Sequence, residues 1–247
     1  MDYAFRTNIS VIGQLAGMVK EEEIKAFVAK KHQFKRTIRR AVVPDSGIIK
    51  GDTLKDSYFP STLFNSSYYD VFISHSHSNE AEAHLLAAWL EKFRGLTCFV
   101  DSFAWGSADQ LLKEIDDKYC IKHRNRNGNS YYYNKRNFTT SHVHAILSMA
   151  LLDTIRRSKY CIFIESAESV PLTSQLKKET LSPWLYEEIK FMQLLQPKRE
   201  TKLFSEGLQK AIVDCKIAYD VTDISEFPFL DYDAFTNFNN GKLLLDY

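Results

Sequence analysis

Residues 68–101, YYDVFISHSHSNEAEAHLLAAWLEKFRGLTCFVD, decide the fold of this chain. Residues 69–74 are short, mostly apolar and rich in strand-forming side chains, as expected of a buried parallel strand. A polar turn follows, and then a helix with its apolar residues on one face that ends near Gly95. A second strand covers residues 96–101. This strand–helix–strand unit predicts a right-handed crossover and a parallel sheet.

The alternation of strands and helices continues along the chain. The predicted elements are a helix over residues 141–157, a strand over 159–166, a helix over 183–195 and a last strand over 215–221. Ser141 and Ser182 are the expected N-caps of the two helices, and Pro183 suits the first helical position because its missing N–H costs nothing there. This order of elements predicts an α/β fold with a doubly wound parallel sheet.

Two segments fall outside this pattern. Residues 1–67 are predicted to be an N-terminal extension, with a helix over residues 20–40 and an irregular linker over 41–67, so that the main domain covers 68–247. An insertion over about 107–140 carries a short helix, 107–117, and then a β-hairpin that turns at Asn127-Gly128.

Composition excludes several classes of protein. The 247 residues hold 32 Lys and Arg against 31 Asp and Glu, so no global charge draws the chain to nucleic acid or an anionic membrane. No apolar run is long enough for a transmembrane helix, and the first residues lack the pattern of a signal peptide. The four scattered cysteines indicate a reduced, cytoplasmic protein with neither a zinc site nor a disulfide framework. Motifs for a dinucleotide clamp, a P-loop and a hydrolase elbow are absent.

Three blocks of sequence resemble the TIR (Toll/interleukin-1 receptor) domain family. They are YYDVFISHS with the helix and strand after it, LLDTIRRSKYCIFIES, and SPWLYEEI, in the family's order over residues 68–195. The resemblance implies a flavodoxin-like parallel sheet of about five strands, in agreement with the α/β prediction above. The long insertion with SHVHAILSMAL resembles a branch of stand-alone bacterial TIR proteins. Members of that branch in Thoeris-type antiphage systems are similar to this chain, and there a nucleotide product activates a separate effector protein.

The resemblance also implies an activity. Trp184 and Glu188 match the tryptophan and catalytic glutamate of NAD-cleaving TIR domains, and their spacing places both on one helix face. Glu187 points about 100° away and is the natural decoy. Nicotinamide leaves NAD as a neutral group, so one carboxylate that stabilises the oxocarbenium-like ribosyl centre suffices. NAD is thus the expected substrate, and no cofactor or metal is expected.

Further residues are candidates for binding NAD. Ser74, His75 and Ser76 follow the first predicted strand, at the edge where open parallel sheets bind ligands. Trp105 and Gly106 correspond to the family's BB loop after the second strand. His142 and His144 are expected at a helix N-terminus, where the dipole keeps them neutral and favours phosphate, although capping is the simpler interpretation.

Alternatives remain open. Glu188 could be incidental in a non-catalytic TIR module that binds other proteins, and cleavage of another nucleoside would need the same chemistry. The product could be hydrolysed to ADP-ribose, cyclised or transferred. A homo-oligomer is expected, because TIR active sites are often completed between neighbouring domains and the extra segments offer surface for contact. Residues 118–137 carry six Lys and Arg, no acid and four tyrosines, which is the best nucleic-acid signal. A solvated hairpin or an oligomer contact is preferred for them.

Overall fold

The computed structural model describes residues 3–38, 51, 69–125, 128–167, 169–170, 172–174, 177–180, 182–196 and 219–236. Its strands are β1 (Tyr3–Asn8), β2 (Val71–Ser74), β3 (Cys98–Val100), β4 (Ile121–Asn125), β5 (Gly128–Tyr131), β6 (Tyr160–Glu165), β7 (Leu172–Ser174), β8 (Lys177–Thr180) and β9 (Tyr219–Asp220). Its α-helices are α1 (Ile9–Leu15), α2 (Glu21–Ile38), α4 (Glu80–Arg94), α5 (Ser102–Tyr119), α6 (Tyr133–Arg157), α7 (Pro183–Leu195) and α8 (Tyr232–Thr236). Short 3-10 helices are η1 (Ala16–Met18), η2 (His77–Asn79) and η3 (Thr222–Glu226).

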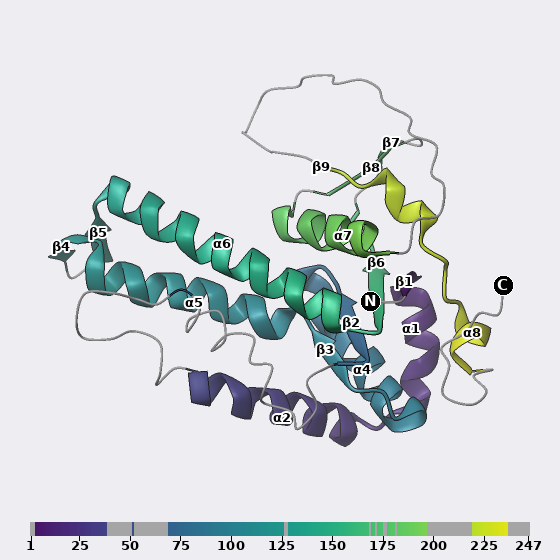
Figure 1. Ribbon diagram of the computed structural model, residues 1–247. Coiled ribbons are helices and arrows are strands. Elements are labelled where there is room, and N and C mark those ends of the chain that lie inside the picture. Colours follow the sequence, from purple (N-terminus) through teal and green to yellow (C-terminus); the bar gives the residue numbers. More distant parts are fainter. Residues whose placement is uncertain are drawn as a thin grey trace.

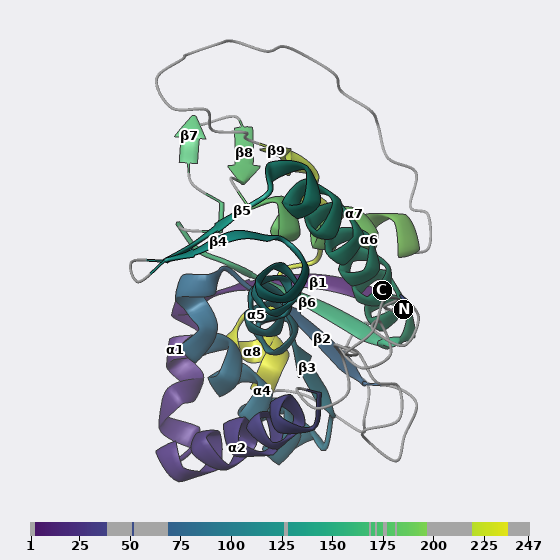
Figure 2. The ribbon, with the colours of Figure 1, turned by 90° about the vertical axis from the view of Figure 1, so that its left-hand side faces the viewer.

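The core is a four-stranded sheet in the order β1-β6-β2-β3, in which every pair of neighbouring strands is parallel. Helices cover both faces of this sheet (Figures 1 and 2). Side chains alternate along each strand, so that Val71 and Ile73 pack with α1, α2, α4 and α8, whereas Phe72 packs with α6, α7 and η3. The predicted α/β fold with a parallel sheet is therefore confirmed.

The sequence predicted residues 1–67 to be an extension to the main domain, but their described part contributes to the core of the sheet. Strand β1 pairs with β6 along its whole length, and Phe5 is buried with Ile12 and Leu15 of α1. The helix predicted over residues 20–40 is present as α2, and its Phe27 is buried against the same face. The predicted linker lies outside the described residues, apart from Gly51.

The last strand of the sheet was predicted at residues 215–221, and this prediction is wrong for the part of that segment that is described. Only Tyr219 and Asp220 form a strand, and β9 pairs antiparallel with β8 in a separate small sheet. Strand β1 holds the position beside β6 instead. A strand of two residues is too short for its hydrophobic pattern to indicate its partner. The sequence alone therefore could not show whether this segment joins the parallel sheet or pairs antiparallel with β8.

The predicted insertion is a helical arm. Helices α5 and α6 run side by side away from the sheet, and the predicted β-hairpin, β4-β5, lies at the far end (Figures 1 and 2). The 25 residues of α6 give it a length of about 37 Å. Asn127 of the predicted turn lies outside the described residues, and Gly128 has a φ of 130°, which favours glycine.

Both arm helices begin earlier than predicted. Helix α5 starts at Ser102, so that Trp105 and Gly106 lie in its first turns and not in a loop. Helix α6 starts at Tyr133 and not after Ser141, whose hydroxyl bonds the carbonyl of Asn137 within the helix. The early start of α6 is supported by a tertiary contact with α5.

Asp116 of α5 is buried and binds the first turns of α6. Its carboxylate accepts hydrogen bonds from Arg136 Nε at 2.9 Å and from the Thr139 hydroxyl at 2.7 Å. A buried carboxylate needs such partners, and these hydrogen bonds stabilise the first turns of α6, which include Thr139, a residue of modest helix propensity.

Candidate functional site

The candidate site lies at the carboxyl edge of the sheet, where strands β2 and β6 end side by side. From β2 the chain passes through α4 to the edge strand β3, and it then returns through α5 and α6 to β6 on the other side of β2. The segments after β2 and β6 thus lead to opposite faces of the sheet. Such a reversal is where open parallel sheets bind their ligands.

Helix α7 places a carboxylate at this edge. It begins as predicted at Pro183, and the Ser182 hydroxyl accepts a hydrogen bond from the Leu185 backbone N–H. Glu188 lies on the face of α7 that is buried against the sheet, and its side chain is 0% exposed. The Ser74 hydroxyl, at the end of β2, donates a hydrogen bond to Glu188 Oε2. Ser74, one of the residues predicted to bind NAD, therefore contacts Glu188 directly.

Cys161, a buried residue of β6, lies in the same environment. Burial raises the pKa of its thiol, and the charge of Glu188 raises it further. The thiol therefore remains protonated at neutral pH and behaves as a small apolar group. The described cysteines, Cys98, Cys120 and Cys161, are unbridged, and Cys215 lies outside the described residues.

The side of α7 that carries Trp184 and Glu187 contacts the arm, next to the side that buries Glu188. The Trp184 ring, half-buried, stacks on the exposed His144 ring with centroids 4.6 Å apart and planes at 26°. One turn further along both helices, the Ser148 hydroxyl donates a hydrogen bond of 2.8 Å to Glu187 Oε2. Glu187 therefore binds α6, whereas its neighbour Glu188 is buried against the sheet, as the 100° separation of adjacent helical residues requires.

A second buried pair fixes the turn after β2. His75 Nε2 lies 2.8 Å from Asp101 Oδ1, and His75 Nδ1 lies 2.6 Å from the Ser76 carbonyl oxygen. Asp101 Oδ2 also accepts a hydrogen bond from the His75 backbone N–H at 3.2 Å. Burial alone lowers the pKa of His75, but the charge and hydrogen bond of Asp101, aided by the Ser76 carbonyl and Glu80, outweigh it, so the pKa is raised. Nδ1 faces a carbonyl oxygen and Nε2 lies beside a carboxylate oxygen, and both neighbours favour the protonated imidazolium over the neutral ring.

The remaining predicted binding residues lie elsewhere. The Ser76 hydroxyl bonds Ser78 and Asn79 within the same turn. His142 is exposed and packs on Phe138, with ring centroids 4.3 Å apart. Neither His142 nor His144 is at a helix N-terminus, because α6 begins at Tyr133, so the predicted dipole effect and phosphate site there are wrong. The Trp105 side chain lies outside the described residues, and Gly106 is part of α5.

Sequence reasoning missed two residues at this edge. Arg6 of β1 pairs with Glu165 at the end of β6, with Nη1 3.1 Å from Oε2, and its Nε donates to the Phe227 carbonyl. Asp101 was noted only as the end of a strand, without its partner His75. Asp101 could have been found from its sequence position, because polar residues directly after a parallel strand lie at the edge that binds ligands. Arg6 had no such signal, because the strand that carries it was not predicted.

Among the described residues, no group of three or more His, Cys, Asp and Glu side chains is placed to hold a metal ion. No helix in the described part of the chain combines the length and apolar character needed to cross a membrane. Comparisons with models of protein families, with curated proteins and with solved structures found no match to this chain.

Proposed function

We propose that this chain is an NAD-cleaving enzyme of the TIR kind, with that family's flavodoxin-like, doubly wound fold. The observation that carries the proposal is the buried Glu188 carboxylate, held by the Ser74 hydroxyl at the reversal point of the parallel sheet. Ser74 belongs to the first block of the TIR resemblance and Glu188 to the third, and the contact between these residues, 114 positions apart, supports the proposal.

The chemistry requires one negative charge beside the nicotinamide ribose. The bond between ribose C1′ and the pyridinium nitrogen breaks, and its electron pair stays with the nitrogen, so that neutral nicotinamide leaves. Glu188 stabilises the positive charge that develops on the ribosyl centre. Water then attacks C1′ and loses a proton, which gives ADP-ribose; an internal adenine nitrogen as nucleophile gives a cyclic product instead.

Trp184 supplies the recognition of the pyridinium ring in this proposal. It lies one helical turn before Glu188 and keeps part of its ring exposed beside His144. An aromatic face attracts a cation with about 0.5–2 kcal/mol. Because Glu188 itself has no exposed surface, NAD must displace the Ser74 contact to reach the carboxylate, and Ser74 can then donate its hydroxyl to the ribose instead.

The same burial favours one alternative, a TIR-like module without catalytic activity. A carboxylate that is wholly buried and hydrogen-bonded to a serine can have a purely structural role, which is to hold α7 against the sheet. The enzyme would cleave NAD, whereas the interaction module would not, so a single assay of NAD cleavage distinguishes the two functions.

The assay follows nicotinamide and ADP-ribose-derived products by liquid chromatography and mass spectrometry after the full chain is incubated with NAD. The wild-type protein is expected to release nicotinamide, and Glu188→Gln is expected to lower the rate at least about 100-fold. Glu187→Gln is the matched control, because it changes the same charge on the next residue and is expected to stay within about threefold. The absence of nicotinamide release by the wild type, or full activity in Glu188→Gln, would refute catalysis and favour the interaction module. In the proposal, the product acts as a signal to a separate effector protein.

A further inference from the structure

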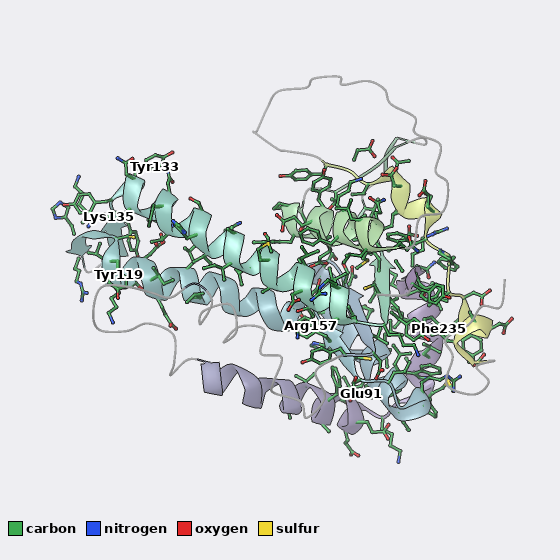
Figure 3. All side chains as sticks on the ribbon, viewed as in Figure 1. Glu91, Tyr119, Tyr133, Lys135, Arg157 and Phe235 are labelled. Atoms are coloured by element: carbon green, nitrogen blue, oxygen red, sulfur yellow. The ribbon has the colours of Figure 1, made fainter. Side chains whose placement is uncertain are left out.

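The arm formed by α5, α6 and the β4-β5 hairpin ends in a surface that the proposed NAD chemistry does not use. We name this surface the arm tip; its described basic and aromatic side chains are Lys122, Arg124, Tyr131, Tyr132, Tyr133, Lys135, Arg136 and Phe138. The arm carries these residues away from the sheet, and the labelled Tyr119, Tyr133 and Lys135 lie at its far end (Figure 3). Their distance from the core means that the arm tip is not needed to cover it.

Basic and acidic residues are unevenly distributed along the chain. No acidic residue occurs from Lys118 to Leu152, and six Lys and Arg residues fall in that stretch. The rest of the chain therefore holds 26 of the 32 basic residues and all 31 acidic ones. A chain that is nearly neutral overall thus has an acid-free basic segment in the arm, and residues 24–44, with seven Lys and Arg and no acid, form a second one. A basic segment of this kind favours binding to a polyanion.

Contacts within the arm neutralise little of this positive charge. Of the two acids near the end of α5, Asp116 binds Arg136 and Thr139, and Asp117 accepts hydrogen bonds from the Tyr131 hydroxyl and the Asn129 amide. In the part of the chain that the structure describes, no ion pair involves Lys122, Arg124 or Lys135. Lys122 and Lys135 instead lie 6.0 and 5.2 Å from the centre of the same ring, that of Tyr132.

Aromatic rings are exposed among these cations. Tyr133 is 77% exposed, Phe138 66% and Tyr132 47%. Large aromatic side chains normally bury most of their surface. Of these three rings, Tyr132 lies beside two lysines, and exposed aromatic rings can form platforms on which bases stack while nearby cations contact phosphates. A duplex keeps its bases stacked inside, whereas a single strand can present them to these rings.

We propose that the arm tip binds single-stranded nucleic acid. Lys122, Arg124 and Lys135 contact the phosphates, and unpaired bases stack on Tyr133 and Phe138. Single-stranded DNA and RNA both offer phosphates and unpaired bases, and the experiment below shows which of the two binds more tightly.

The experiment measures binding of the full chain to fluorescein-labelled 20-nucleotide oligo(dT), oligo(U) and a 20-base-pair duplex by fluorescence anisotropy. Either single strand is expected to bind at least about tenfold more tightly than the duplex, since only unpaired bases can stack on the rings. Three phosphate contacts predict a slope of about −2 for log K against log salt concentration. The double variant Lys122→Ala/Lys135→Ala is expected to reduce that slope to about −0.7.

Matched variants test the two parts of the surface. Lys25→Ala removes an exposed lysine from α2 and is the control for charge; it is expected to leave binding unchanged. Tyr133→Ala is expected to weaken single-strand binding at least about fivefold, and Tyr133→Trp to restore it, because stacking on an aromatic face is not specific to tyrosine.

Three results would overturn the proposal: no binding of either single strand, equal or tighter binding of the duplex, or an equal effect of Lys25→Ala. Light scattering of the protein alone identifies the competing partner. Self-association that is lost in Lys122→Ala/Lys135→Ala, without oligonucleotide binding, would show that the arm tip contacts a second copy of the chain.

Discussion

The buried pair of His75 and Asp101 makes the pH dependence of stability a direct test of the structure. The perturbation is Asp101→Asn, which keeps an oxygen to accept the hydrogen bond from the His75 backbone N–H but removes the negative charge beside the His75 ring. The side chains are 1% and 3% exposed, so the charge is not screened by solvent. Removing one partner of a buried ion pair costs about 3–5 kcal/mol.

This cost depends on pH with a definite sign. Because the folded-state pKa of His75 is raised, folding favours the protonated ring. The resulting stability is fully present below the unfolded-state pKa and is lost as pH rises through the folded-state pKa. Between those two values, the difference in unfolding free energy between wild type and Asp101→Asn is expected to shrink by up to about 1.4 kcal/mol per pH unit.

The assay is urea unfolding of both proteins at fixed pH values between 6 and 9, with equal m-values required for the comparison. Asp223→Asn is the control, because this more exposed carboxylate pairs with Lys190 at the surface and is expected to change stability by no more than about 1 kcal/mol at every pH. A difference for Asp101→Asn that is constant over the range, or that grows with pH, would mean that His75 is neutral in the folded protein and would refute the reasoning.

Three further predictions concern single residues and are all measured by urea unfolding at pH 7. Glu188→Gln is expected to stay within about 1 kcal/mol of wild type because its amide oxygen can still accept from Ser74, whereas Glu188→Ala is expected to lose about 2–4 kcal/mol from the cavity and the unpaired hydroxyl; equal losses would contradict the buried hydrogen bond. Ser182→Ala is expected to lose about 1 kcal/mol with its hydrogen bond to Leu185, and an unchanged stability would show that the cap does not contribute. Gly95→Ala is expected to lose about 1–2 kcal/mol because its φ of 63° is left-handed, although no atom lies within 4 Å of an added Cβ; a stabilising effect would contradict that backbone conformation.

Elements with local signals could be predicted from the sequence to within a residue or two. Helix α7 starts at Pro183 and ends at Leu195 as expected, because the Ser182 cap, the proline at the first position and the apolar periodicity all lie within the segment itself. Helix α4 ends before Gly95 for the same kind of reason. The separation of Glu187 from Glu188 also follows from helical geometry alone, once the buried face is known.

Only the tertiary structure decided which distant segments pair. Strand β1 is held by hydrogen bonds to β6, more than 150 residues away, so nothing near Arg6 in the sequence indicates that it reaches Glu165. The early start of α6 depends in the same way on Asp116, since Arg136 and Thr139 are held in the helix by a carboxylate from another element. Caps and apolar periodicity act within a few residues and can be read from the chain, whereas the free energy of strand pairing and of a buried charge exists only after the chain has brought the partners together.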